Sequence, residues 1–393
     1  MSLGAVACGG ISGGSNRASA FGPIARPGGP RIKLALNAYS FSKRLNDSAK
    51  GRDSDAKGRD SDTKGQDSDR HSAVTLLSLL DFCARQGFDG FDPTGYFFPG
   101  YPQAPPNEYV NRLKRRAFDL GIGISGTGVR NNFTTADKAV RSAAVEHIRQ
   151  WVEVAARLGA PVLRVFADTQ MKDQTWQTVS RGSPRAEVEG WIADDLRRCA
   201  EHGEKFGVII GVQNHGDFLR TSDEHLSLIR RIDSPWCGPI VDTGYYRSDD
   251  PYQDIAAVAP YAVNWQVKES PVGAGSEVRT DLKRLLSIVR MSGYRGYLPI
   301  ETLSARGAEY DPFDVVPKFL ARLREALDAT ASIAPEPLAE EPAGSAKAPA
   351  GEAIPGNPAA ANPTGGNAAT SQPSSRPARK PPNRDKRNPP ANR

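Results

Sequence analysis

Between residues 31 and 330, short apolar runs alternate with longer stretches in which apolar positions follow the helical repeat. Each run is followed by polar residues, a pattern that predicts strands of a parallel sheet. The predicted strands are Ile32–Asn37, Gly90–Asp92, Ile122–Ser125, Val162–Phe166, Val208–Gln213, Pro239–Asp242, Ala262–Val267 and Tyr297–Glu301. The predicted helices cover approximately Ala73–Gln86, Glu108–Leu120, Ala136–Leu158, Val188–Phe206, Asp223–Ile232, Tyr252–Val258, Leu282–Ser292 and Phe313–Leu327. Several of them end where helices commonly end, at Gly87, Gly121, Gly159, Gly207 and Gly293.

Eight strand–helix units in a row predict one closed (β/α)₈ barrel of the α/β class, the TIM barrel. A doubly wound sheet is the alternative, but its first strand is usually followed by a glycine-rich phosphate-binding turn. Here the first strand leads into Asn37-Ala38-Tyr39-Ser40. The sequence therefore predicts a single-domain barrel over residues 31–330.

The N-terminal leader, residues 1–30, lies outside the barrel pattern. Its first 20 residues are mostly small or apolar and end in Ala18-Ser19-Ala20, which resembles a signal-peptidase site. The basic start of a typical signal peptide is missing. A genuine signal would place the protein in the periplasm, whereas a disordered leader would leave it in the cytoplasm.

Two further segments have no hydrophobic period. Residues 48–71 contain the repeats KGRDSDA, KGRDSDT and KGQDSDR, which have no large apolar residue, so we expect a low-complexity insertion without ordered backbone after the first strand. Residues 331–393 are rich in Pro, Ala and Gly and end in a basic stretch, which predicts a disordered tail.

Charge and composition exclude some classes of protein. The net charge is +6 and the isoelectric point is about 9.1, but the final residues supply much of the excess, so no nucleic-acid partner is expected. No apolar run is long enough to span a membrane. The four cysteines form no CxxC pair and are interpreted as single buried thiols. The sequence leaves open whether the chain forms a homo-oligomer.

Candidate chemistry lies at the ends of the predicted strands, because the active sites of such barrels are built at the C-terminal ends of the strands. Four polar residues close the last four strand patterns: Gln213, Asp242, Gln266 and Glu301. Their side-chain oxygens could converge on one cation. A shell of two carboxylates and two amides suits a hard ion, Mn²⁺ or Mg²⁺, better than zinc.

At these residues the chain resembles the xylose isomerase-like superfamily, which includes sugar phosphate isomerases and epimerases and the type 2 AP endonucleases. The resemblance covers about residues 31–330. It implies a divalent-metal site whose usual ligands are Glu, Asp, His and Glu. This chain keeps Asp242 and Glu301 but has Gln213 and Gln266 at the other two positions, so metal affinity is expected to be lower than in the family.

The resemblance and the neighbouring residues together give a predicted set of site residues. The expected catalytic residues are Glu301, His215 and Lys268, and the expected substrate contacts are Arg164, Asn214, Tyr245 and Glu269. His215 lies in a stretch, QNHG, that resembles the family's ENHG. Lys268 follows Gln266 by two positions, on the same side of an alternating strand, where it could stabilise a developing enolate.

The function implied is a sugar isomerase or epimerase that acts on a keto-sugar or polyol-derived substrate by metal-assisted proton transfer next to a carbonyl. Only one carboxylate of the family's usual pair is kept, which favours a one-base reaction unless His215 or Glu269 takes the second role. The alternatives are a dehydratase of the inosose or dehydroshikimate type and a carbohydrate-binding barrel without catalysis. A zinc endonuclease is disfavoured because four of the five histidines lie in or beside helical segments, away from the strand ends: His71, His147, His202 and His225.

Overall fold

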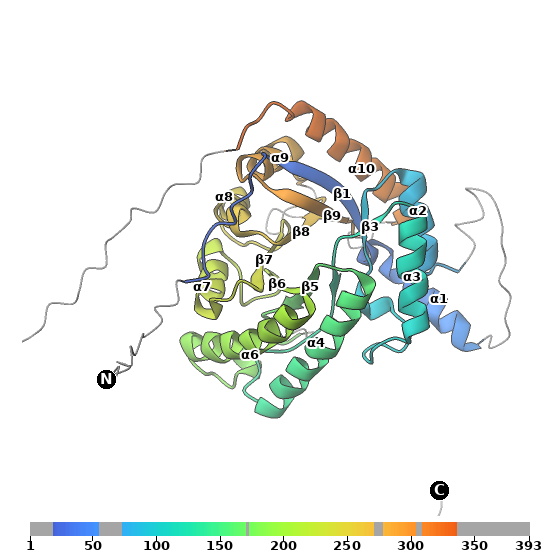
Figure 1. The fold of residues 1–393 in the computed structure, drawn as a ribbon. Helices are drawn as coiled ribbons and strands as arrows, with labels where there is room; N and C mark the ends of the chain where they lie inside the picture. Colours follow the sequence, from blue (N-terminus) through green and yellow to red (C-terminus); the bar gives the residue numbers. More distant parts are fainter. Residues whose placement is uncertain (1–18, 55–72, 170–172, 271–277, 304–308, 336–393) are drawn as a thin grey trace, which may run out of the picture. The chain divides into compact units, whose positions relative to one another are not determined.

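The predicted barrel is present in the computed structural model, which describes residues 19–54, 73–169, 173–270, 278–303 and 309–335. Parallel strands surround a central axis and helices cover the outside (Figure 1). The strands are β1 (Arg31–Asn37), β2 (Gly90–Asp92), β3 (Gly123–Ile124), β4 (Thr127–Gly128), β5 (Val162–Phe166), β6 (Ile209–Gln213), β7 (Cys237–Asp242), β8 (Asn264–Lys268) and β9 (Arg295–Glu301). They agree closely with the predicted strands.

The sheet closes through a strand that is split into two pieces. Its hydrogen-bonded order is β3-β2-β1-β9-β8-β7-β6-β5-β4, so β3 and β4 stand at the two ends. Only Ser125 and Gly126 separate β3 from β4 in the chain. β3 pairs with β2, and β4 pairs with β5. β3 and β4 therefore share the third of eight barrel positions, which confirms the (β/α)₈ fold.

The outer layer contains the predicted helices and some shorter elements. The α-helices are α1 (Ser42–Ser54), α2 (Leu76–Gln86), α3 (Asn107–Asp119), α4 (Lys138–Leu158), α5 (Trp176–Val179), α6 (Arg185–Phe206), α7 (Ser222–Ile232), α8 (Pro251–Val258), α9 (Leu282–Met291) and α10 (Pro312–Ala329). Short 3₁₀ turns are η1 (Ala38–Phe41), η2 (Gly95–Phe97) and η3 (Ala259–Tyr261). The predicted stops are confirmed; for example, Gly159 ends α4 with a φ of 86°.

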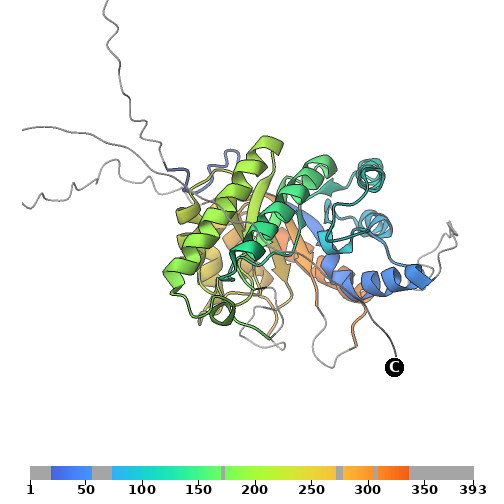
Figure 2. The same cartoon turned by 90° about the horizontal axis from the view of Figure 1, so that it is seen from below.

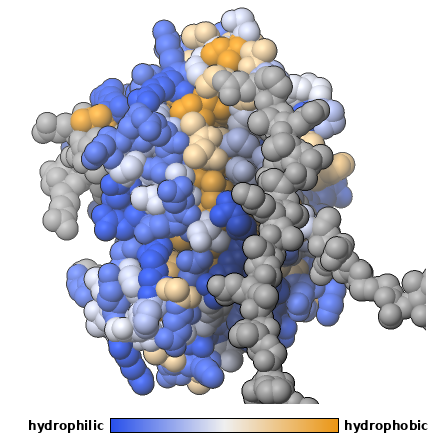
Figure 3. Space-filling view, turned by 90° about the vertical axis from the view of Figure 1, so that its left-hand side faces the viewer, coloured by the Kyte–Doolittle hydropathy of each residue, from blue (hydrophilic) through white to orange (hydrophobic). Residues whose placement is uncertain are grey.

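Apolar side chains fill the space between the barrel and its helices. Trp151 of α4, Trp265 of β8 and Phe91 of β2 are completely buried. Cys83, Cys199 and Cys237 are buried free thiols, as predicted. On the face seen in Figure 3, hydrophilic residues predominate around a narrow band of hydrophobic ones. Within the described ranges, no helix is both long and apolar enough to cross a membrane.

Helix α1 corrects the prediction that residues 48–71 lack ordered backbone. It extends to Ser54, into the first repeat, and projects from the edge of the barrel (Figure 2). Leu45 anchors its first turns in the core, and the amide of Val74 donates to Ser48 Oγ (2.8 Å) across the insertion. Once a helix has been nucleated, each added residue needs little further stabilisation, so an anchored start extends into polar sequence. Residues 55–71 lie outside the described residues.

Residues 19–30 correct the prediction of a leader that ends at residue 30. The Asp233 carboxylate accepts hydrogen bonds from the amides of Ala20 (2.7 Å) and Phe21 (3.1 Å). The Phe21 ring stacks on Tyr261 at 5.0 Å, and Arg26 donates to the carbonyl of Pro260 (3.1 Å). This segment is therefore part of the fold, next to the N-terminal ends of β7 and β8. The signal-like residues 1–18 and the tail from residue 336 lie outside the described residues.

Candidate active site

A cavity of about 880 Å³ opens at the C-terminal ends of the strands. Six of the ten predicted site residues contribute to its lining: Arg164, Gln213, His215, Tyr245, Lys268 and Glu301. They come from β5, β6, β8 and β9 and from the loops after β6 and β7. Because parallel strands all present their C-terminal ends to the same side, residues far apart in sequence meet here.

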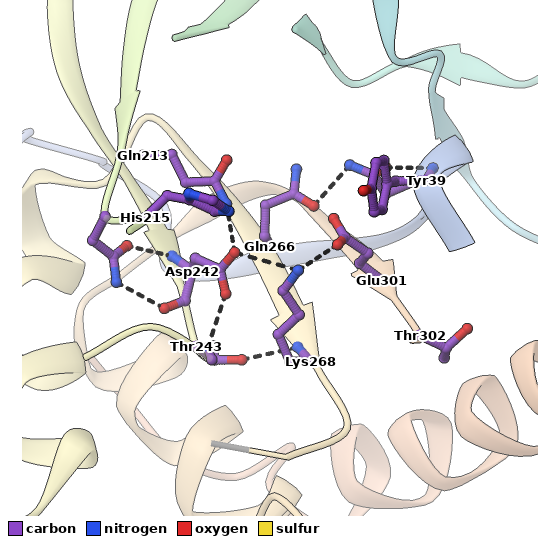
Figure 4. A network of polar contacts seen from close by, with 12 residues as sticks. Tyr39, Gln213, His215, Asp242, Thr243, Gln266, Lys268, Glu301 and Thr302 are labelled. Atoms are coloured by element: carbon purple, nitrogen blue, oxygen red, sulfur yellow. Dashed lines mark hydrogen bonds and ion pairs between the residues drawn. The ribbon is translucent and has the colours of Figure 1, made fainter. Parts of the chain in front are cut away.

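Two carboxylates share the ammonium of Lys268 at the floor of the cavity (Figure 4). Lys268 Nζ donates to Glu301 Oε1 and lies 3.4 Å from Asp242 Oδ2. All three residues are buried. Burial by itself lowers the pKa of Lys268, but the two carboxylates outweigh it and raise that pKa above its ordinary value. The ammonium is therefore charged at neutral pH.

Gln213 completes the environment of Asp242. Its Nε2 donates to Asp242 Oδ2 (2.5 Å), while the amide of Gly244 donates to Asp242 Oδ1 (2.9 Å). Burial raises the pKa of Asp242, and Lys268 opposes this shift. Gln213 Oε1 is buried and has no hydrogen-bond partner among the described residues. Such a buried acceptor is costly to leave without a partner, and Gln213 also contributes to the lining of the cavity.

Gln266 links the carboxylates to the other side of the barrel. The orientation that satisfies both ends of its amide puts Oε1 3.1 Å from Arg164 Nη1 and Nε2 3.2 Å from Glu301 Oε2. Asn37 Nδ2 of β1 then lies 3.0 Å from the same oxygen. Both the oxygen and the nitrogen of the Gln266 amide therefore have hydrogen-bond partners within the protein.

Asp92, at the end of β2, was missed by the sequence analysis. Its carboxylate is buried and lies near Arg164, Glu301 and Gln266. Burial raises its pKa to about 6, against the opposing charge of Arg164. The rule used for the other strands, which singles out the polar residue that closes each run, would have found Asp92 and also Asn37.

His215 forms a dyad with a second residue that the sequence analysis did not identify. Its Nδ1 lies 2.5 Å from Asp168 Oδ2, in the loop after β5. The imidazole stacks on Tyr245 with ring centroids 4.2 Å apart and contacts the edge of Phe166. Gly216 permits this arrangement, because its φ is +71° and a Cβ there would lie 2.5 Å from the Asp168 carboxylate. A carboxylate on Nδ1 fixes the tautomer of a histidine and turns Nε2 toward other chemistry.

Two predicted substrate contacts lie apart from the cavity lining. The Asn214 amide is buried and bonds the backbone of Asp242 in both directions, with Nδ2 donating to the carbonyl (2.9 Å) and Oδ1 accepting from the amide (2.7 Å). Glu269 Oε1 lies 4.0 Å from Arg322 Nη1 of α10. The structure thus gives Asn214 a role in positioning Asp242 and turns Glu269 toward the helical layer.

The predicted metal ligands lie together but do not fit a divalent ion as they stand. An ammonium already contacts both carboxylates, Gln213 presents its NH₂ to Asp242, and the Gln266 oxygen is used by Arg164. Among the described residues, no group of three His, Cys, Asp or Glu side chains is arranged to hold a metal.

A parallel eight-unit barrel with a polar cluster at the C-terminal strand ends is a TIM barrel whose candidate site lies where such barrels build their active sites. The family model for the xylose isomerase-like TIM barrel matches residues 80–333, and the chain belongs to that family.

Solved structures with the same fold include three epimerases. L-ribulose 3-epimerase is 18% identical with a TM-score of 0.58, covering 76% of this chain and 96% of its own. D-psicose 3-epimerase from Clostridium cellulolyticum H10, solved with D-tagatose, is 14% identical with a TM-score of 0.54, covering 77% and 99%. The 3-keto-D-glucoside 4-epimerase from E. coli is 16% identical with a TM-score of 0.53, covering 64% and 94%. No curated protein sequence matches the chain significantly.

Proposed function

We propose that this protein is a sugar epimerase or isomerase that moves a proton on the carbon next to a carbonyl group. The observation that carries the proposal is the convergence of Lys268, Glu301 and His215 on one cavity. A volume of about 880 Å³ lies within the usual range for small-molecule sites and accommodates a monosaccharide. Solved structures that share the fold include epimerases of ketoses and of a 3-keto-glucoside, which supports the same class of substrate here.

Lys268 has the role of stabilising charge on the carbonyl oxygen. Removing a proton from the neighbouring carbon sends the C–H electron pair toward the carbonyl and leaves a negative oxygen, an enediolate if that carbon carries a hydroxyl. A buried ammonium fixed by two carboxylates is preorganised to donate to that oxygen. The pKa of Lys268 is raised, so the charge is in place throughout the reaction.

Glu301 and His215 are the two candidate bases. They come from β9 and from the loop after β6, and in the view of Figure 4 they lie on either side of Lys268. In an epimerisation, one base takes the proton from one face of the carbon and the conjugate acid of the other returns a proton to the opposite face. His215 with Asp168 thus supplies the second base that Gln213 cannot provide. Glu269, the other candidate, is turned toward Arg322.

Mn²⁺ or Mg²⁺, expected from the resemblance, is not part of this proposal. A metal held by Gln213, Asp242, Gln266 and Glu301 would supply a Lewis acid for the same carbonyl oxygen. It would require Lys268 to leave its position between the two carboxylates. No step proposed above depends on it.

Solvent proton exchange tests the proposal. The purified protein is incubated in D₂O with D-tagatose, L-ribulose or a 3-keto-glucoside, and deuterium at the carbon next to the carbonyl is followed by NMR. We expect exchange with at least one of these ketoses, a rate about 10³-fold lower in Glu301→Gln, and an unchanged rate in the control Glu269→Gln. Binding of the ketoses without exchange would contradict the proposal and indicate a carbohydrate-binding barrel. A product lighter by one water would instead identify a dehydratase.

A further inference from the structure

The charges around Lys268 are close to balanced without any added ion. Asp242 and Glu301 carry two negative charges, and Lys268 and Arg164 carry two positive ones; all four residues are buried. Asp92 adds at most one further negative charge, so the net charge of the group lies between zero and −1. A divalent ion placed among these residues would leave a net positive charge in a buried site, which is costly.

We infer that the ammonium of Lys268 is the resident cation of this site and that the protein works without a divalent metal. Nζ bonds Glu301 and lies 3.4 Å from Asp242, so it stands where an ion bridging these two carboxylates would have to bind. The inference rests on the proposed function only for what the ammonium does in catalysis. Its statement about metal binding rests on the arrangement of the side chains alone.

Gln213 provides independent support. Its NH₂ group, a donor, faces Asp242 Oδ2 at 2.5 Å. A glutamate at this position would place a third carboxylate against Asp242, and like charges at this distance require a proton or a further cation between them. The amide removes that requirement. The ammonium of Lys268 then satisfies the carboxylates of Asp242 and Glu301. An amide at position 213 and an ammonium at position 268 are therefore consistent with each other.

The position of Lys268 also leaves it able to act on a substrate. An ammonium has three N–H donors, of which the two carboxylates account for two at most. Lys268 contributes to the lining of the cavity, so a remaining donor is available to a substrate oxygen. Gln213 contributes to the lining of the same cavity, and its Oε1 is buried without a partner among the described residues, so we infer that it accepts from a substrate hydroxyl on binding. The pair recognises an oxygen acceptor and a hydroxyl donor side by side, as in an α-hydroxy ketone.

The test is calorimetric titration of chelator-treated protein with Mn²⁺ in the absence of substrate. We expect no stoichiometric binding by the wild type up to about 1 mM. The double variant Gln213→Glu/Lys268→Met exchanges the ammonium for a third carboxylate and should gain one Mn²⁺ site at least about 100-fold tighter than the wild type. Lys283→Met, which removes an exposed lysine of α9, is the matched control and should behave as the wild type.

Two further measurements keep the inference testable. If the double variant does not fold, Gln213→Glu alone retains Lys268 and should still bind no stoichiometric Mn²⁺ at about 100 μM. Any ketose that exchanges deuterium should do so equally well in excess EDTA. Stoichiometric binding of Mn²⁺ by the wild type at about 10 μM or below, or exchange that EDTA abolishes and Mn²⁺ restores, would overturn the inference. Because the titration needs no substrate, its outcome is independent of whether the proposed reaction is correct.

Discussion

Two buried clusters of opposite charges can be compared in this barrel. Between α4 and α6, Arg141 Nε bonds Asp195 (3.0 Å), Arg141 Nη1 donates to the Thr135 carbonyl (2.7 Å), and the guanidinium lies over the ring of Trp191. Arg198 also reaches Asp195 at 3.3 Å. At the mouth of the barrel, Lys268 is shared by two carboxylates, and Gln213 Oε1 and Arg164 Nε are buried without a partner among the described residues.

The difference indicates what each cluster is for. The Arg141 cluster uses its hydrogen-bonding groups on the protein itself and joins two helices. The Lys268 cluster contributes to the lining of a cavity and keeps an unused acceptor, an arrangement that costs stability and is retained where a ligand binds. A buried ion pair alone does not identify a functional site, whereas a buried network with unsatisfied atoms beside a cavity does.

The largest expected effect is on catalysis, from Lys268→Met. Removing the donor to the developing oxyanion should lower kcat/KM by about 10³-fold for whichever ketose is turned over. The ratio is measured by the same deuterium exchange assay, with circular dichroism used to verify folding. An activity within a few-fold of the wild type would contradict the role of Lys268.

The matching change in the other cluster, Arg141→Met, should act on stability. It leaves the Asp195 carboxylate buried without its main partner and should lower the free energy of unfolding by about 3 to 5 kcal/mol, with little change in kcat/KM of the remaining folded enzyme. Urea unfolding gives the first quantity. Arg141→Met/Asp195→Leu should recover much of the loss, and failure to do so would show that the pair does more than join two helices.

The dyad is tested by Asp168→Asn. An amide can hold His215 in the wrong tautomer, so we expect the exchange rate to fall by about 10²-fold while the affinity for the ketose changes little. Single-turnover exchange and equilibrium binding separate the two quantities. If Asp168→Asn weakens binding but leaves the rate of exchange intact, His215 positions the substrate and Glu301 is the only base.

The smallest expected effect concerns pH and Asp92. The pKa of the Asp92 carboxyl is about 6 in the folded protein, above the value of about 3.9 in an unfolded chain. Its protonated form therefore contributes to the free energy of unfolding below about pH 4. This contribution is lost as the pH rises through 6. The amide of Asp92→Asn does not titrate, so the variant does not lose this contribution as the pH rises. Relative to the wild type, the free energy of unfolding of the variant should therefore rise between pH 4 and 7 by an amount on the order of 2 kcal/mol. A difference that does not change with pH would show that Asp92 does not titrate in this range.

The sequence predicted the barrel because its hydrophobic period repeats eight times, and it predicted much of the site because parallel strands present their last residues to one side. Gln213, Asp242, Gln266 and Glu301 follow from that rule. Asp92 and Asn37 follow from it equally and were overlooked.

Other features depend on contacts that no local pattern contains. The bonds of Lys268 to Glu301 and Asp242 depend on three neighbouring strands lying in register, and the contact of His215 with Asp168 joins two loops 47 residues apart. The packing of residues 19–30 depends on Asp233, more than 200 positions further along the chain. Tertiary contacts of this kind determine whether a polar residue is a ligand contact, a positioning residue or part of an ion pair.

A crystal structure of the wild-type protein with a bound ketose, grown with Mn²⁺ present, tests the account most directly. The account predicts the ketose carbonyl oxygen within about 3 Å of Lys268 Nζ, a substrate hydroxyl on Gln213 Oε1, and no metal between Asp242 and Glu301. A Mn²⁺ ion bound by these two carboxylates, with Lys268 turned away, would contradict it.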